Sequence, residues 1–215
     1  MDDGVMVGIA GTILTVGHSN HDLEFFVGLL DAHCVTALAD VRSLPYSRFN
    51  SQFNREQLAE SLKGSGIKYV YLGRELGGRS DDRSNYERGR IRYDRLANTT
   101  RFRDGLERIL RGAEDCRIAL MCAEQEPLDC HRMLLVGHEL DRLGVDVAHI
   151  LPDKSSESHA DAMDRLLAKF GLDEYDLINR DEPREARVRK AIELQAKFVG
   201  HAVEHERELA EKEAP

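Results

Sequence analysis

The chain has 215 residues, of which 41% are hydrophobic, and a formal net charge of -9. This length supports one sizeable core plus a smaller appendage, and the acidic balance argues against a protein that binds nucleic acid over its whole surface. No basic stretch precedes an apolar one at the N-terminus and the apolar runs are too short to cross a bilayer, so we expect a cytoplasmic protein with no membrane partner and reduced thiols.

The first part of the chain alternates short apolar runs with amphipathic stretches. Residues 12–16 (TILTV) predict a strand, and residues 22–30 predict a helix because their apolar residues recur at helical spacing. Residues 35–41 (VTALADV) predict a second strand, and residues 54–63 predict a helix with an asparagine N-cap. Residues 68–72 (KYVYL) predict a third strand.

The alternation continues after a long interruption. Residues 74–98 show no sustained period, which is typical of a functional or disordered loop. Residues 99–110 predict a helix, 117–121 a strand, 132–143 a helix and 145–151 a fifth strand. This order predicts an α/β three-layer sandwich with a mostly parallel sheet.

The C-terminal part has a different composition. From about residue 155 the chain reads as helical, acidic and strand-free, and residues 192–212 predict a solvated terminal helix suited to self-association. We therefore expect an α/β core domain over residues 1–152 and a helical extension over residues 153–215, in a chain that is able to form a homo-oligomer.

Polar side chains follow four of the predicted strands. Ligands of open parallel sheets bind outside the carboxyl ends of the strands, where helix N-termini point. We therefore expect a cleft that binds a small anion. The side chains assigned to it are His18, Ser19, Asp40, Arg42, Ser47, Arg48 and Arg132. The alternatives are an Asp40–Arg42 ion pair and a His18 that only packs at its turn.

The segment after the fourth strand, LMCAEQEPLDCHR, carries the most reactive residues. Asp129 is predicted to cap the following helix, which would place Cys130 in the first turn and lower the pKa of its thiol. The expected catalytic residues are Cys130 or Cys122, as nucleophile or ligand, and Glu124 and His131, as proton-transfer groups. Equally, either cysteine would serve as a small buried apolar residue, which is our interpretation of Cys34 and Cys116.

Spacing bears on other chemistries. Six residues after Cys122 and Cys130 stand Leu128 and Val136, which excludes a cysteine-dependent phosphatase loop as usually built. Cys122 and Cys130 lie too far apart in sequence for the usual zinc pairs, and Cys130 and His131 are directly adjacent, so we assign no metal. A metal would need His18 or another distant group. The first turn lacks G-x-G-x-x-G, so no NAD or FAD cofactor is assigned.

Residues 79–111 form a basic segment, with ten arginines and six acids. Arginine suits bidentate contact with phosphate, although a salt-bridged surface is the simpler interpretation. The segment keeps nucleic acid as a second candidate partner.

Four motifs, TVGHSN, DVRSLPYSR, YVYLGRELGG and LMCAEQEPLDCHR, resemble the prokaryotic family called domain of unknown function 488. The likeness covers about residues 12–152 and adds Gly77 and Gly78 to the expected substrate-binding residues. It implies a three-layer α/β domain, and some members carry the label of DNA-repair proteins. Three functions follow as hypotheses: an enzyme acting on a small anionic or nucleotide-like substrate, a nucleic-acid-binding or DNA-repair accessory protein, and a non-catalytic anion sensor.

Overall fold

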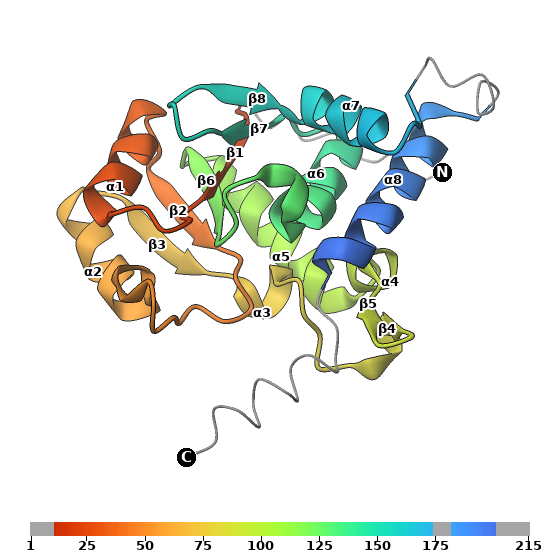
Figure 1. Ribbon diagram of the computed structural model, residues 1–215. Coiled ribbons are helices and arrows are strands. Elements are labelled where there is room, and N and C mark those ends of the chain that lie inside the picture. Colours follow the sequence, from red (N-terminus) through yellow and green to blue (C-terminus); the bar gives the residue numbers. More distant parts are fainter. Residues whose placement is uncertain (1–10, 174–181, 201–215) are drawn as a thin grey trace, which may run out of the picture.

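A six-stranded sheet in the order β3-β2-β6-β1-β7-β8 forms the centre of the computed structural model, which describes residues 11–173 and 182–200 (Figure 1). Five strands are parallel: β1 (Ile13–Gly17), β2 (Ala37–Asp40), β3 (Lys68–Tyr71), β6 (Ile118–Cys122) and β7 (Val147–Ile150). The sixth, β8 (Ser156–Ser158), pairs antiparallel with β7.

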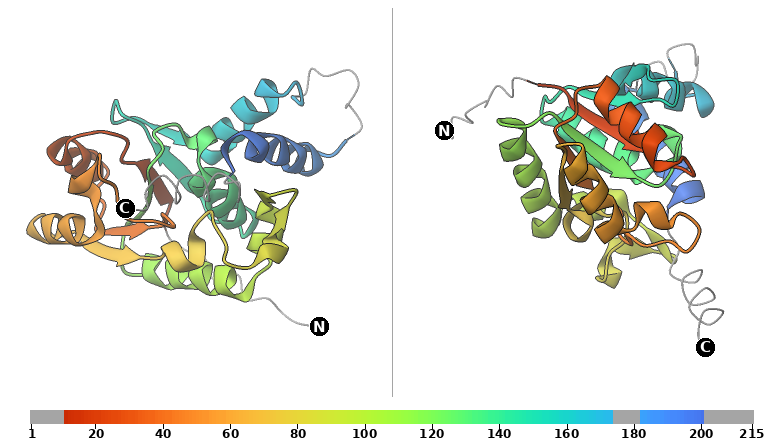
Figure 2. Two further views of the ribbon diagram at one scale, coloured as in Figure 1. Left: turned by 60° about the horizontal axis from the view of Figure 1, so that its bottom comes forward. Right: turned by 90° about the vertical axis from the view of Figure 1, so that its left-hand side faces the viewer.

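Helices cover both faces of the sheet (Figure 2). One face packs on α1 (Leu23–Ala32) and α2 (Arg55–Gly64). The other face packs on α5 (Thr100–Ala113), a π-helical segment (Arg132–Gly137) that continues into α6 (His138–Arg142), α7 (His159–Lys169) and α8 (Arg184–Val199). The predicted three-layer α/β architecture is therefore confirmed.

Local signals explain where these helices begin. The Asp22 side chain accepts a hydrogen bond from the Phe25 amide, and the Thr99 side chain accepts one from the Phe102 amide. Asn54 stands at the start of α2 as predicted, but its side chain accepts from the Ser47 amide and makes no cap bond. The prediction was right about the position and wrong about the bond.

The unpatterned stretch between β3 and α5 is built from short elements. It contains α3 (Gly73–Leu76), a 3-10 turn (Arg83–Asn85), the hairpin of β4 (Tyr86–Glu87) and β5 (Arg90–Ile91), and α4 (Tyr93–Ala97). A further 3-10 turn (Ser51–Phe53) precedes α2. Elements of two to five residues are too short to produce a recognisable period.

The C-terminal part differs from its prediction in one respect. The expectation of a strand-free extension is wrong, because Ser156–Ser158 extends the sheet. The helical character is confirmed by α7 and α8, which share the hydrophobic core. Of the helix expected over residues 192–212, residues 201–212 lie outside the described part of the chain. None of the helices described is long and apolar enough to span a bilayer.

Candidate functional site

The carboxyl ends of the central strands meet at one edge of the sheet. Gly17 at the end of β1 is in register with Cys122 at the end of β6, and Asp40 of β2 is in register with Met121. Two backbone bonds continue the ladder beyond the strands: the His18 amide donates to Cys122 O (2.9 Å), and the Ser19 amide donates to Ala123 O (2.9 Å).

This edge is also the point where the chain changes sides. The helix after β1 packs on one face of the sheet, whereas the helix after the neighbouring β6 packs on the other. Between two such strands the connecting segments diverge, and open α/β sheets place their ligand sites in the resulting crevice. The loop between β6 and α6 carries four of the predicted site residues into this position.

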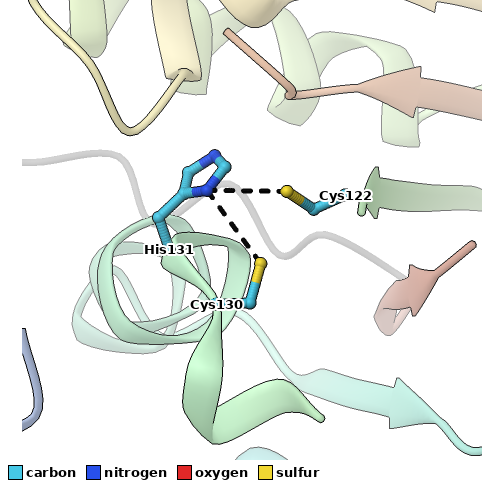
Figure 3. Close-up of side chains that lie close together, drawn as sticks. All are labelled: Cys122, Cys130 and His131. Atoms are coloured by element: carbon cyan, nitrogen blue, oxygen red, sulfur yellow. Dashed lines mark hydrogen bonds between the residues drawn. The ribbon is translucent and has the colours of Figure 1, made fainter. Parts of the chain in front are cut away.

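Three side chains, one from the end of β6 and two from this loop, converge at the edge of the sheet (Figure 3). Sγ of Cys122 lies 3.6 Å from Nδ1 of His131, and Sγ of Cys130 lies 4.0 Å from the same nitrogen. All three atoms lie within 4.8 Å of one another. Both cysteines are buried. The arrangement needs no help from His18 to bring together ligands that suit a soft divalent metal.

The His131 ring is held in one orientation. Its Nε2 donates to the carbonyl oxygen of Val41 at 3.0 Å, so in the neutral ring the lone pair is on Nδ1, which faces the two sulfurs. The ring packs closely against Gly78, and a Cβ at that position would lie 2.9 Å from Cγ of His131, which is too close. A histidine whose outer nitrogen is anchored on a carbonyl has the typical environment of a metal ligand.

Backbone conformation explains how adjacent residues share one site. Cys130 is extended (φ -136°, ψ 139°) and His131 is helical (φ -62°, ψ -22°). The predicted cap is wrong: Asp129 ends a 3-10 turn (Pro127–Asp129), and Cys130 itself precedes the π-helical segment. The Arg132 amide donates to Sγ of Cys130 at 3.4 Å, so the thiol occupies the capping position. π-Helical turns occur frequently at functional sites.

The Glu124 carboxylate accepts a hydrogen bond from the Cys130 thiol. Sγ of Cys130 lies 3.0 Å from Oε2 of Glu124, a distance at which both groups cannot be ionised without a large repulsion. Burial and the charge of Cys130 raise the pKa of Glu124. Burial also opposes ionisation of Cys130, but hydrogen bonding to Cys122 and the positive charges of Arg132 and His131 outweigh it and lower its pKa.

Cys130 also shifts the pKa values of Cys122 and His131. Burial raises the pKa of the Cys122 thiol, and the neighbouring Cys130 raises it further. Burial lowers the pKa of His131, but its hydrogen bond to Cys130 and the negative charge there outweigh burial and raise it. A proton is thus held among these four groups, and metal binding would release it.

Arg132 holds the loop together from inside. Its side chain is fully buried, and its guanidinium donates to the carbonyl oxygens of Glu124 and, at 2.8 Å, Gln125. It forms no salt bridge with the Glu124 carboxylate. Its Nε has no hydrogen-bond partner among the described residues, and anion binding by Arg132 stays a prediction.

A second buried network lies beside the cluster. Arg42 bonds Asp40 through two nitrogens at 2.9 and 2.7 Å, which is the local ion pair that the sequence offered as an alternative. A third nitrogen contacts Nε2 of His18 at 3.1 Å. Burial, followed by the charge of Arg42, lowers the pKa of His18 to about 4. These three predicted residues meet one another, and their polar groups are directed at protein partners.

The remaining predicted residues lie in turns. Oγ of Ser47 accepts from the amides of Phe49 and Asn50, and Arg48 is exposed with its guanidinium 6.0 Å from the centre of the Phe49 ring. Ser19 adopts a positive φ of 48° directly after β1. Gly77 is buried, and a Cβ there would lie 2.3 Å from the Gly73 oxygen. Each has a local structural role, and contact with a substrate stays a prediction.

Close backbone contact at Gly17 is a testable requirement of the site. A Cβ at Gly17 would lie 1.9 Å from the carbonyl oxygen of Glu124. We expect Gly17→Ala to lower the free energy of unfolding by about 2–3 kcal/mol, because backbone must move. Gly28→Ala in α1 is the matched control, since a Cβ there meets nothing within 4 Å; it should raise stability by about 0.5–1 kcal/mol. Urea titration of both variants measures the difference, and equal effects would contradict the requirement.

Two expectations about other residues are settled by the structure. Cys34 is exposed and Cys116 is half-buried, so reading both as buried apolar residues was wrong. In the basic segment five of the ten arginines form ion pairs with acidic side chains: Arg92, Arg95, Arg101, Arg108 and Arg111.

Some residues of the site carry no signal in the sequence. The Val41 carbonyl that orients His131 comes from a different strand, and any residue type would supply it. Tyr93 lies near the cluster: burial raises its pKa, and the charges of Cys130, Cys122 and Glu124 raise it further.

Comparison with known proteins identifies the relationship of the chain. A family model described as domain of unknown function DUF488 matches residues 22–138. The match contains Cys122, Glu124, Cys130 and His131, and it ends at the start of α6. No curated protein and no solved structure matches the chain. Because the matched region covers more than half of its length, the chain belongs to the DUF488 family.

Proposed function

We propose that the chain is a metal-dependent hydrolytic enzyme acting on a small anionic, nucleotide-like substrate. Cys122, Cys130 and His131 would bind a zinc ion, and Glu124 would transfer protons. The observation that supports this most is the convergence of two thiols and an oriented imidazole nitrogen within 4.8 Å.

The distances between these atoms favour a tetrahedral ion. Bonds of about 2.3 Å to sulfur and 2.0–2.1 Å to nitrogen place neighbouring ligand atoms roughly 3.5–3.8 Å apart. The sulfur–nitrogen distances are 3.6 and 4.0 Å and all three atoms lie within 4.8 Å of one another, so the ligand atoms would have to approach one another by about 1 Å or less around the ion. Two thiolates with an imidazole favour zinc over harder cations.

The chemistry suits catalysis because only three ligands come from this cluster. Three protein ligands and an open fourth position are the pattern of catalytic rather than structural zinc. A zinc ion held there would act as a Lewis acid and lower the pKa of water. Glu124 is exposed to solvent as a residue, but its carboxyl contacts Cys130. The carboxyl therefore lies between the cluster and solvent. Zinc nucleobase deaminases use the same combination: one histidine and two cysteines bind the zinc, and a glutamate that is not a ligand transfers protons. This chemical analogy supports a nucleotide-like substrate.

Metal removal provides the test. Chelation should release about one zinc per chain, abolish turnover and make Cys122 and Cys130 reactive toward iodoacetamide, because a sulfur that is bound to the ion is protected from alkylation. Mass spectrometry of the adducts has an internal control in Cys34, which is exposed and should react equally with and without metal. Identical alkylation of Cys122 and Cys130 in both states would refute the metal assignment.

A thiolate nucleophile is the second candidate, favoured by the 3.0 Å contact between Cys130 and Glu124. A nucleophile bonded directly to a proton acceptor is the usual arrangement of covalent catalysis. This candidate predicts that the metal-free chain retains turnover and that Cys130→Ser abolishes it. The metal-dependent candidate predicts no turnover in either sample.

The nucleic-acid alternative receives less support, because acidic neighbours already pair with half of the arginines between residues 79 and 111. It predicts affinity for DNA or RNA that falls steeply as salt rises. Absence of binding at low salt would remove it.

A further inference from the structure

A cavity of about 860 Å³ lies beside the π-helical segment that follows Cys130 and His131. It is enclosed by the hairpin of β4 and β5, by α4, by the π-helical segment and by α8, which gather on one side of the molecule (Figures 1 and 2). Its volume is within the range of small-molecule sites, roughly 300–1,000 Å³. Helix α8 lies outside the matched family region, so one wall of the cavity comes from beyond the matched residues.

The floor of the cavity is apolar. Its buried side chains belong to β5, α4, the π-helical segment and α8: Ile91, Tyr93, Leu134, Leu135, Ile192 and Ala196. Apolar surface of this kind suits a flat organic group, since its burial removes both surfaces from water.

The rim carries unbalanced positive charge. All four acidic side chains of the wall are already paired: Glu87, Asp94 and Glu193 with Arg92, and Glu139 with Arg142. Among the described residues, four cations of the wall form no ion pair: Arg88, Arg90, Arg189 and Lys197. An apolar floor below such a rim fits an aromatic group that bears phosphates.

Residues of the cavity wall contact the loop between β6 and α6 that carries Cys130. Tyr93 lines the cavity and also lies within electrostatic range of Cys130. On α8, the Gln195 side chain donates to the carbonyl oxygen of Leu128 at 2.9 Å and to Asp129 at 2.8 Å. The wall of the cavity thus holds the segment that presents Cys130.

We propose that this cavity binds a nucleotide, with its base on the apolar floor and its phosphates at the cationic rim. The further claim that this nucleotide is the substrate of the zinc centre rests on the proposed function. Nucleotide binding to the cavity is a separate claim that is tested by itself.

The test is calorimetric titration of the full chain with ADP, adenosine and inorganic pyrophosphate. ADP should bind more tightly than either fragment, and its affinity should fall as salt rises. The double variant Arg189→Ala/Lys197→Ala should weaken ADP binding by at least about fivefold. Lys190→Ala is the matched control, because Lys190 is an exposed neighbour of Arg189 on α8 outside the cavity lining and its loss should change nothing.

A second variant tests the floor. Ala97→Phe adds a ring at a half-buried lining position, so it should reduce ADP affinity while leaving the fold intact by circular dichroism. Absence of saturable ADP binding, equal affinity for pyrophosphate, or unchanged affinity in both variants would overturn the inference. Zinc content measured on the same samples separates the two claims: bound zinc without ADP binding refutes the cavity alone, and ADP binding without zinc refutes the metal centre alone.

Discussion

Replacing Cys130 by serine is expected to weaken zinc binding by more than about a hundredfold. Loss of a residue that merely supports a metal ligand typically costs ten- to a hundredfold, and a ligand contributes more. Serine preserves the size of the side chain and loses the soft thiolate donor. Competition with a chromophoric chelator measures the affinity.

Cys116→Ser is the matched control for this substitution. Cys116 is half-buried and contacts Nζ of Lys68 at 3.7 Å, away from the cluster. Its variant should bind zinc as tightly as the unaltered chain. If Cys130→Ser and Cys116→Ser bind zinc with the same affinity, Cys130 is not a ligand.

Acidification is expected to destabilise the fold steeply between about pH 6.5 and pH 4. Nε2 of His149 lies 3.2 Å from Nδ1 of His159, and the His138 ring stacks on His159 with centres 6.4 Å apart. Burial lowers the pKa of His138 and of His159 to about 4, and burial lowers that of His149 well below its usual value. As pH falls, the unfolded chain therefore binds protons before the folded one does.

The size of the effect follows from this difference. Stability from these histidines is fully present above their unfolded pKa near 6.5 and is lost toward pH 4. Each contributes about 1.4 kcal/mol per pH unit, or about 4 kcal/mol per unit for three. Urea titrations at several pH values, all with a chelator so that metal release adds nothing, measure the slope.

A variant isolates the contribution of one ring. His138→Gln should reduce the slope by about 1.4 kcal/mol per pH unit, and it should break no side-chain hydrogen bond, because the His138 ring makes none within the described part of the chain. His33→Gln, at a half-buried position outside the His138, His149 and His159 cluster, is the control for the substitution itself. A stability that stays constant from pH 7 to pH 5 would contradict the role of the buried histidines.

Much of the fold follows from patterns within single segments. Apolar runs such as residues 118–122 are buried on both sides and gave strands within two residues of their observed ends. The strand Ser156–Ser158 was missed because it has no apolar residue, and only its pairing with β7 makes it a strand. The short elements between β3 and α5 were missed for a related reason, since tertiary contacts define them.

The sequence predicted where the site lies better than it predicted the chemistry of the site. The strand-end rule brought His18, Asp40 and Cys122 to one edge, where the structure has them. Sequence spacing argued against a metal because Cys130 and His131 are adjacent. The change from extended to helical backbone between these two residues removes that objection, and no spacing rule contains it.

X-ray absorption at the zinc edge tests the central claim most directly. The account predicts two sulfur ligands at about 2.3 Å and one imidazole nitrogen at about 2.0–2.1 Å around zinc in the purified chain, with one sulfur lost in Cys122→Ser. A zinc environment made only of oxygen and nitrogen, or one that Cys122→Ser leaves unchanged, would contradict it.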